Sequence, residues 1–397
     1  MQEANRMKRL PQYLFTIMDG LKQQAQARGL DVIDLGMGNP DLPSPPNVVQ
    51  ALLKAAVKPE NHRYPKPTDE VAKRFRRAIA QWYDQRFGVR LDPDTEVLPL
   101  IGSKEGIAHL SLAFLNNDDI GMVTSPTYPV HANGIIMAGG ILYNIPIGPE
   151  NNFRPNLNAL SKEVVRMTKL LIVSYPHNPT TACVDLDFYN ELVAWGKGKE
   201  TILCSDLAYS DIVFDGYKAP SLLQAKGARD RDAYCVEFHT CSKSYNMAGW
   251  RIGWAVGHPE ILQSLAKAKS YIDFGIFPAV QEAAIEALIG PQDYVHNLVK
   301  TYKSRRDLFV PGLQALGWNV PLPKATFYVW AHIPQKFSGL TSIDFAKLLV
   351  NEAGIVTAPG TGFGEYGEGF VRFALVAPED RLKVSLERIK KVLALKG

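Results

Sequence analysis

The most informative stretch of the sequence is Thr240-Cys241-Ser242-Lys243-Ser244-Tyr245-Asn246-Met247-Ala248-Gly249-Trp250-Arg251-Ile252-Gly253. It joins two short β-rich runs, 233–238 and 252–256. Similar β-rich runs alternate with longer helical patterns through the middle of the chain. This alternation predicts an α/β fold with a mostly parallel sheet that helices cover on both faces.

The other predicted strands of this sheet are 97–101, 120–124, 140–145, 170–174 and 201–205. Helical patterns between the strands include 104–114, 186–195 and 261–270. A last segment carries helical patterns at 293–316, 342–353 and 379–394 around short strands at 325–331 and 369–374, which predicts a smaller α+β domain. Because the Pro-rich run 39–46 is typical of a rigid connector, the first forty-odd residues are expected to pack with this smaller domain. The predicted divisions are 1–46 (N-terminal arm and part of the small domain), 47–286 (large domain) and 287–397 (C-terminal small domain).

Composition narrows the possible functions. The 397 residues are 46% hydrophobic, and Lys+Arg 44 against Asp+Glu 40 leaves a scattered net charge of +4, so neither nucleic acid nor a membrane surface is indicated as a partner. The four cysteines lack C-x-x-C spacing, which predicts reduced thiols and no metal site. The sequence shows no apolar run of about 18 residues and no secretory signal, so a cytoplasmic protein is expected.

Lys243 is the first candidate for chemistry. An aldehyde cofactor needs a primary amine for a Schiff base, and lysine supplies one. Ser242 and Arg251 would offer hydroxyl and guanidinium donors to a phosphate on that cofactor. An isolated Ser-Lys-Ser is more often a solvated loop, so the interpretation depends on the rest of the chain.

Two further candidates follow a predicted strand. Asp206 comes after the apolar run 201–204, and Tyr209 lies three residues on. Active sites of α/β proteins lie at the carboxyl ends of strands, where a carboxylate can pair with a protonated ring nitrogen. A helix N-cap is an equally common role for such an aspartate.

Asn178, in Asn178-Pro179-Thr180, also follows a strand, although this tripeptide is by itself a turn signal. Ser103 and Lys104 open a helical pattern after Gly102, and backbone N–H groups at a helix N-terminus can receive a phosphate. The P-loop spacing is absent, so this loop alone is weak evidence.

Tyr128 follows a strand and is placed to stack on a planar ring, though a packing tyrosine is commoner. Arg372 lies in the apolar strand Val371-Arg372-Phe373-Ala374-Leu375, where burial is costly without a partner. A substrate carboxylate held by two parallel N–H···O bonds would be one partner, and a structural salt bridge is the alternative.

Taken together and in this order, these motifs resemble class I/II aminotransferases of the aspartate aminotransferase fold (PLP fold type I), which use pyridoxal 5′-phosphate (PLP). The resemblance extends from Asp34 to the last helix. Residues 242–253 are most similar to bacterial alanine:2-oxoglutarate aminotransferases, with LL-diaminopimelate aminotransferases as near neighbours.

The resemblance implies three catalytic residues: Lys243 carries the Schiff base, Asp206 pairs with the pyridine nitrogen, and Tyr209 binds the phenolic oxygen with Asn178. Tyr128 would stack on the ring. The implied phosphate ligands are Ser103, Lys104, Ser242 and Arg251.

The resemblance also implies that Arg372 binds the substrate α-carboxylate with help from Asn178 and the backbone near Gly38. Tyr13 is a candidate lid residue, with a packing role as the alternative. Relatives are homodimers in which a tyrosine reaches the phosphate of the partner subunit, and Tyr64 is the candidate here. The residues after Tyr64 depart from the family pattern, because they contain no glycine.

The expected reaction is transfer of an amino group between an L-amino acid and a 2-oxo acid, with alanine and 2-oxoglutarate preferred. LL-diaminopimelate or aspartate is the alternative amino donor, and Lys104 is an alternative ligand for a distal substrate carboxylate. A PLP-dependent C–S lyase and a non-catalytic PLP-binding regulator are the rival classes. The regulator would want a DNA-binding segment before Asp34, where about thirty residues stand.

Overall fold

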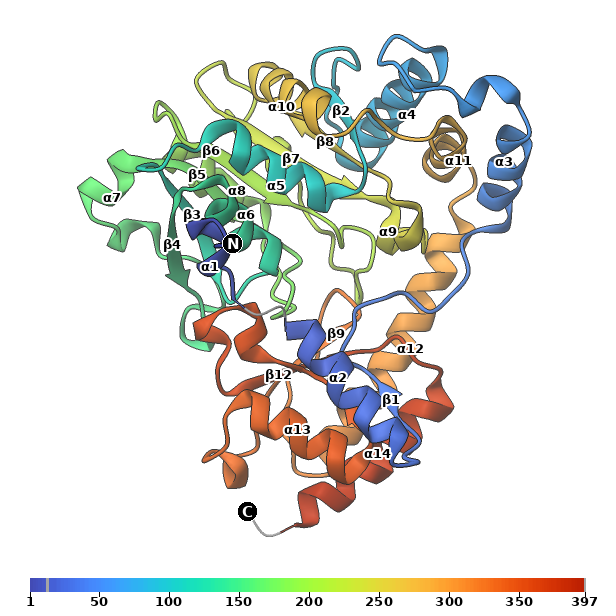
Figure 1. The fold of residues 1–397 in the computed structure, drawn as a ribbon, viewed down its shortest axis with the longest axis vertical. Helices are drawn as coiled ribbons and strands as arrows, with labels where there is room; N and C mark the ends of the chain where they lie inside the picture. The colour runs from blue at the N-terminus through green and yellow to red at the C-terminus, as the bar shows by residue number, and fades with distance from the viewer. Residues whose placement is uncertain (12–13, 396–397) are drawn as a thin grey trace.

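The computed structural model describes residues 1–11 and 14–395, and within them a seven-stranded sheet forms the centre of the large domain (Figure 1). Its strand order is β2-β8-β7-β6-β5-β3-β4. The strands are β2 (Val97–Leu100), β3 (Ile120–Ser125), β4 (Ile141–Pro146), β5 (Thr168–Val173), β6 (Ile202–Asp206), β7 (Cys235–Thr240) and β8 (Gly253–Gly257). All seven coincide with predicted strands to within two residues at either end.

The sheet is mostly parallel, as expected. Strands β4, β3, β5, β6 and β7 pair in parallel, whereas β8 is antiparallel to both β7 and β2. The chain between β7 and β8 contains the short helix α9 (Cys241–Ser244) and the 3₁₀ turn at Ala248–Trp250. Neither helix is long enough to run back along the sheet as a parallel crossover requires, and β8 returns antiparallel.

Helices cover both faces of the sheet, and β5 shows why. Leu170 and Ile172 enter a core with α5 (Ser103–Phe114) and α10 (Pro259–Ile272), while Leu171 and Val173 enter a second core with α4 (Glu70–Phe87) and α8 (Leu186–Gly196). Successive side chains of a strand point to opposite faces, so a continuous apolar run requires cover on both sides. The other large-domain helices are α3 (Pro46–Ala56), α6 (Pro129–Ala138), α7 (Lys162–Met167) and α11 (Pro278–Ile289).

Both ends of the chain build the smaller α+β domain, as predicted (Figure 1). The N-terminal strand β1 (Ile33–Asp34) pairs in parallel with β10 (Ile355–Val356), and one apolar core joins Ile33 to Phe309, Val329 and Ile389. The remaining elements are α2 (Leu14–Ala27), α12 (Asp293–Ala315), β9 (Tyr328–His332), α13 (Ser342–Ala353), β11 (Ala358–Pro359), β12 (Phe370–Ala374) and α14 (Glu379–Ala394).

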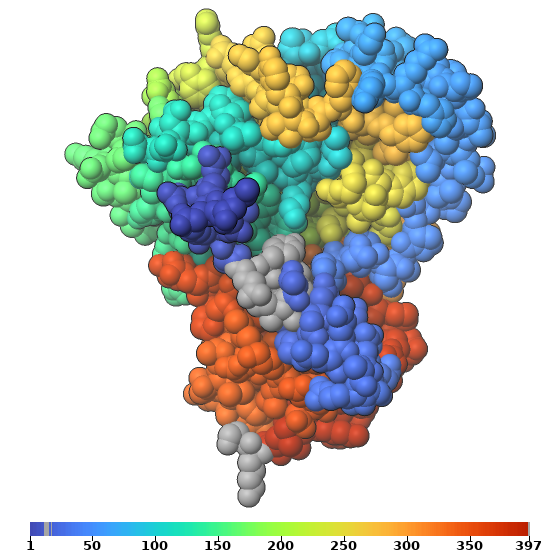
Figure 2. Space-filling model, in the orientation of Figure 1, coloured from blue at the N-terminus to red at the C-terminus, as the bar shows by residue number. Residues whose placement is uncertain are grey.

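The first residues differ from the expectation that the whole N-terminal segment packs with the small domain. Helix α1 (Asn5–Lys8) lies on the large domain, where Arg9 Nη2 donates to the carbonyl oxygen of Gly140 at 3.1 Å. Helix α2 lies on the C-terminal segments instead (Figure 2). The guanidinium finds an accepting carbonyl beside β4, a contact that sequence spacing does not reveal. The exact domain boundaries and the cytoplasmic location stay predictions.

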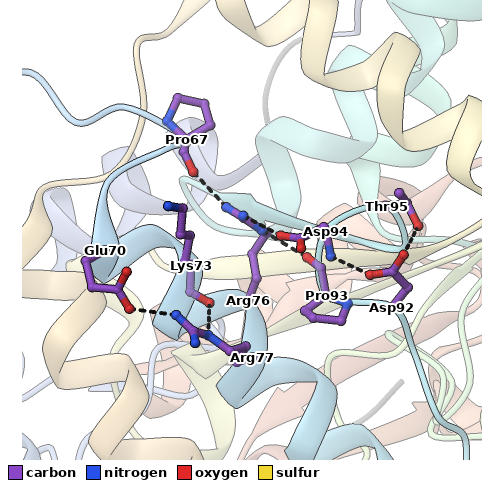
Figure 3. Close-up of polar contacts among 9 residues, drawn as sticks. All are labelled: Pro67, Glu70, Lys73, Arg76, Arg77, Asp92, Pro93, Asp94 and Thr95. Carbon is purple, nitrogen blue, oxygen red and sulfur yellow. Dashed lines mark hydrogen bonds and ion pairs between the residues drawn. The ribbon is translucent and has the colours of Figure 1, made fainter.

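The glycine-free loop after Tyr64 is held by side chains (Figure 3). Arg76 donates to the carbonyl oxygens of Pro67 and Pro93, each at 2.9 Å, and to Asp94 Oδ1 at 2.8 Å. Within the described chain, none of residues 64–77 has a positive φ. The loop therefore needs no glycine, because no residue in it adopts the left-handed conformation.

In the described parts of the chain, we find no helix with the length and apolar character required to cross a bilayer.

A buried polar network is centred on Glu237 in β7, the strand that leads to Lys243. Glu237 of β7 accepts hydrogen bonds from Tyr83 Oη at 2.5 Å and from the backbone N–H of Leu222 at 2.8 Å, and its Oε1 lies 3.0 Å from His239 Nε2. The Glu237 and His239 side chains are fully buried. Because these three groups share this carboxylate as a hydrogen-bond partner, its removal would leave several buried polar groups without one.

We predict that Glu237→Ala lowers the free energy of unfolding by about 3–5 kcal/mol, because it removes the anionic centre of a buried network. Denaturant titration followed by tryptophan fluorescence measures the change. Glu200→Ala is the matched control, since Glu200 pairs with Lys169 at 2.8 Å on the surface and should cost less than about 1 kcal/mol. Equal destabilisation by the two variants would contradict the prediction.

Candidate active site

The carboxyl ends of three parallel strands meet at one cavity of about 560 Å³. Ser174 follows β5, Asp206 ends β6, and β7 runs through Thr240 into α9, which carries Lys243. Strands that run in parallel deliver their C-terminal residues to the same edge, so neighbours in space need not be neighbours in sequence. The lining residues are Met37, Gly38, Asn39, Ser103, Lys104, Tyr128, Ser174, Asn178, Asp206, Ala208, Tyr209, Thr240, Ser242, Lys243, Ala248, Arg251, Tyr328 and Arg372.

Lys243 points into this cavity and is poorly solvated. Its Nζ donates to the carbonyl oxygen of Gly38 at 2.8 Å. Burial, reinforced by the positive charges of Arg372 and Arg251, lowers the pKa of Lys243 to about 7, and Asp206 partly opposes the shift. A neutral amine is the nucleophilic and proton-accepting form of lysine, so the site prepares Lys243 for chemistry near neutral pH.

Asp206 has one carboxylate oxygen engaged and one directed at no protein group. Oδ2 lies 3.0 Å from His131 Nε2, and Thr127 Oγ1 lies 2.7 Å from His131 Nδ1. Oδ1 is buried and has no hydrogen-bond partner among the described residues. A buried carboxylate oxygen without a partner is costly, and a protonated ring nitrogen would satisfy it.

Arg372 links the two domains. Its Nη1 donates to Asn178 Oδ1 at 2.7 Å and its Nη2 to the carbonyl oxygen of Gly36 at 2.8 Å, while Nε is buried and has no partner within 1–11 and 14–395. Because the amide oxygen of Asn178 already accepts from Arg372, its NH₂ group is the end left to donate elsewhere.

The cavity also gathers groups that could bind a phosphate. Gly102, with φ of 79°, is the N-cap of α5, so the first N–H groups of this helix face the cavity beside Ser103. A Cβ atom at Gly102 would lie 2.5 Å from Arg251 Nη2, which explains why glycine is needed there. Burial, and then the charge of Arg251, lowers the pKa of Lys104. Ser242 Oγ is 2.9 Å from Thr240 Oγ1.

The structure brings nearly all predicted site residues to the cavity, including Gly38, Tyr128 and Tyr209. Tyr64 is the exception, because it is 77% exposed, packs against Phe274 with the two rings tilted and their centroids 4.9 Å apart, and does not line the cavity of its own chain. Tyr13 lies outside the described residues.

Sequence reasoning missed Tyr328, Ser174 and His131. Tyr328 Oη is 2.9 Å from Tyr209 Oη, and Ser174 Oγ donates to the carbonyl oxygen of Asp206 at 2.9 Å. Ser174 directly follows a predicted strand, as Asp206 does, and that signal was available. No spacing rule connects His131 to Asp206, which lies 75 positions further along the chain.

These groups fit PLP on structural grounds. The cavity holds a poorly solvated primary amine, a buried carboxylate oxygen without a partner, an amide with a donor end, and a helix N-terminus beside a guanidinium. Each matches one polar feature of a phosphorylated pyridine aldehyde. Fold and site together fit an enzyme that binds such a cofactor, with Lys243 as the amine that could hold it.

Comparison with known proteins identifies the family. The model of the family "aminotransferase class I and II" matches residues 30–389. The chain is 47% identical over 393 residues to an LL-diaminopimelate aminotransferase of Moorella thermoacetica, covering 99% of each chain. It is 45% identical over 392 residues to the glutamate-pyruvate aminotransferase AlaC of Escherichia coli, covering 99% of this chain and 94% of the relative.

Among solved structures, substrate-bound BacF from Bacillus subtilis superimposes with a TM-score of 0.93 at 36% identity, over 100% of this chain and 98% of that one. The chain belongs to the class I and II aminotransferases, which confirms the predicted family, the aspartate aminotransferase fold and the PLP-dependent transaminase chemistry.

We predict that Lys243 becomes reactive as the pH rises through about 7, because its lowered pKa leaves the amine neutral above that point and protonated below it. Amine labelling of cofactor-free protein, followed at Lys243 by mass spectrometry between pH 5.5 and 9.5, measures the midpoint. Labelling of the exposed Lys54 in the same digest controls for the reagent. Labelling of Lys243 that still climbs steeply above pH 9 would show that its amine is not desolvated as described.

Proposed function

We propose that this aminotransferase takes LL-diaminopimelate as its preferred amino substrate, with 2-oxoglutarate and glutamate as the other pair. The sequence alone favoured alanine, with LL-diaminopimelate as an alternative. The relatives support that alternative better, because enzymes named LL-diaminopimelate aminotransferase from Moorella thermoacetica and Aquifex aeolicus are 47% and 46% identical over nearly the full chain.

The charge of the cavity carries this proposal. Among its described lining residues, Lys104, Lys243, Arg251 and Arg372 are basic, and Asp206 is the one carboxylate. A phosphate and the α-carboxylate of the substrate account for part of this positive charge. A second carboxylate, which LL-diaminopimelate, glutamate and 2-oxoglutarate all possess and alanine lacks, would compensate more of it.

The residues have distinct tasks in the reaction. Bound PLP supplies an electron sink for the pair released when the Cα–H bond breaks. Arg372 holds the α-carboxylate, and neutral Lys243 takes the proton from the substrate α-carbon and returns it as a general acid. Asp206, oriented by His131, keeps a proton on the ring nitrogen, while Tyr209 and the NH₂ group of Asn178 donate to the phenolic oxygen.

Ser103, Ser242 and Arg251 are assigned to the phosphate, and Tyr128 to the face of the ring. Tyr128 lines the cavity next to His131, with ring centroids 5.8 Å apart in a T-shaped arrangement. These contacts orient the cofactor and take no part in proton transfer.

Alanine is the second candidate, and the 45% identity to the Escherichia coli glutamate-pyruvate enzyme favours it. Lys104 distinguishes the two proposals in physical terms. If its ammonium group contacts a distal carboxylate, removing Lys104 should lower kcat/KM most for dicarboxylic substrates. If it contacts the phosphate, kcat/KM should fall equally for all substrates.

We further propose a homodimer in which Tyr64 completes the site of the partner subunit. Tyr64 packs against Phe274, which is 63% exposed, and two more exposed aromatic residues, Tyr271 (86%) and Phe277 (40%), lie three positions on either side of Phe274 in the chain. Large exposed apolar groups gathered on one surface are typical of a protein interface. The position of Tyr64 outside the cavity of its own chain agrees with service to another chain.

The substrate proposal predicts that LL-diaminopimelate gives the highest kcat/KM in a panel of amino donors assayed with 2-oxoglutarate, and that Lys243→Ala abolishes all turnover. The panel should contain alanine, aspartate and a β-substituted alanine. Lys104→Ala should lower kcat/KM for dicarboxylic substrates about tenfold more than for alanine, the loss expected for one charge-assisted contact. A clear preference for alanine would overturn the substrate, and acceptor-independent release of pyruvate and ammonia would indicate elimination chemistry.

The dimer proposal predicts complementation between inactive subunits. Lys243→Ala and Tyr64→Ala proteins, unfolded together and refolded, should form mixed dimers with one site that has both Lys243 and Tyr64. Activity should therefore rise well above that of either variant refolded alone. If Tyr64 acted in its own subunit or had no role, mixing would restore nothing beyond the average of the two variants.

A further inference from the structure

Tyr328 occupies the junction between the groups assigned to cofactor and to substrate. It begins β9 in the small domain, is 3% exposed, and lines the cavity. In the antiparallel ladder Ala374 pairs with Tyr328 and Arg372 with Trp330, so Tyr328 and Arg372 are diagonal neighbours on the same face of the sheet. This register brings an aromatic ring against the buried guanidinium.

The Tyr328 ring supports Arg372. The Cζ atom of Arg372 lies 4.1 Å from the centroid of the Tyr328 ring and 4.6 Å from that of Phe363. A guanidinium over aromatic faces gains cation–π attraction and loses freedom to rotate. The donors of Arg372 are thereby kept in one orientation.

The Tyr328 hydroxyl contacts Tyr209, which belongs to the large domain. The two hydroxyl oxygens are 2.9 Å apart. Burial, together with the adjacent Tyr328 hydroxyl, raises the pKa of Tyr209 well above its usual value, so Tyr209 keeps its proton at neutral pH. When Tyr209 donates its proton to an acceptor in the cavity, its oxygen can accept from Tyr328.

Gly38 is packed directly on this hydroxyl. A Cβ atom at position 38 would lie 1.9 Å from Tyr328 Oη, and the carbonyl oxygen of Gly38 accepts from Lys243. Tyr328 therefore also limits how the segment that faces Lys243 can move.

We propose that Tyr328 is a positioning residue of the transamination site, which strengthens hydrogen-bond donation by Tyr209 through its hydroxyl and orients Arg372 through its ring. The proposal rests on the roles assigned above to Tyr209 and Arg372, and it is independent of which amino acid is the substrate. Donation from Tyr328 polarises the Tyr209 O–H bond, which makes Tyr209 a better donor. The two parts of the side chain serve different ligands and can be tested separately.

The hydroxyl is tested by pH titration of the absorption band of the bound cofactor without substrate. A weaker donor stabilises negative charge on the phenolic oxygen less, so the midpoint should move to higher pH. Tyr209→Phe should move it most, Tyr328→Phe less and in the same direction, and the double variant no further than Tyr209→Phe alone. This non-additivity is the signature of action through Tyr209.

Tyr302→Phe is the matched control. Tyr302 is a fully buried tyrosine of the same apolar cluster, its ring centroid is 5.0 Å from that of Phe327, and its hydroxyl has no hydrogen-bond partner within the described ranges. Loss of the Tyr302 hydroxyl should leave the titration midpoint of the cofactor unchanged. A Tyr328→Phe midpoint equal to that of the unmodified enzyme, or a shift fully additive with Tyr209→Phe, would overturn the proposal. No shift in Tyr209→Phe would overturn both assignments.

The ring is tested by the split between KM and kcat. Tyr328→Phe keeps the ring and should change KM for the amino substrate less than about threefold, whereas Tyr328→Leu should raise it about 3- to 30-fold, the range expected for a lost cation–π contact. Equal KM values for the Phe and Leu variants would refute orientation of Arg372 by the ring. If the Leu variant does not fold, the Phe variants and their titration still decide the role of the hydroxyl.

Discussion

The site depends on one constraint, the buried positive charge of Arg372, which has no carboxylate partner among the described residues. Arg372 is 2% exposed, and among the described residues its hydrogen bonds go to the neutral oxygens of Asn178 and Gly36. Such a charge is expensive to bury unless an anion completes its environment. In the proposed role of Arg372, binding of the substrate carboxylate supplies this anion and offsets the desolvation cost of the guanidinium.

The same positive charge extends to Lys243. Burial is the main cause of the lowered pKa of this amine, and Arg372 and Arg251 add to it. Two requirements of transamination, a grip on the carboxylate and a neutral amine at neutral pH, are thus met by one arrangement of charges. Asp206 opposes the shift, but burial and the two guanidinium charges outweigh it. Substrate binding at Arg372 would neutralise part of the field and make Lys243 a stronger base when the substrate is present.

The fold was predictable from sequence because its strands are short apolar runs that differ clearly from the helices between them. Leu170 to Val173 enter cores on both faces, which is the property that a continuous apolar run encodes. The direction of β8 was not predicted, since it follows from the lack of a long helix in the connection after Lys243. Most of the candidate site was also predictable, because Asp206 ends a strand, Asn178 lies in the loop after one, and the edge of a parallel sheet gathers such residues.

What escaped sequence reasoning depends on contacts between distant segments. His131 lies one helical turn into α6 and meets Asp206 only through the packing of that helix against the sheet. Tyr328 reads as an ordinary aromatic in a strand until the register of β9 and β12 sets it against Arg372. Tyr64 is the reverse case. Its sequence context predicts a site residue, but within its own chain it is exposed on the surface.

The division of labour between the two domains bears on substrate choice. The edge of the large sheet supplies Asp206, Lys243 and the N-terminal end of α5, the groups proposed to hold the cofactor. Arg372, the proposed ligand of the substrate carboxylate, comes from the small domain, and Met37, Gly38 and Asn39 line the cavity from the N-terminal segment. Because these elements come from both chain termini, they can vary without disturbing the parallel sheet that holds the cofactor. Preference for one amino acid over another should therefore reside mainly in the small domain and the N-terminal segment, with Lys104 as the contribution from the large domain.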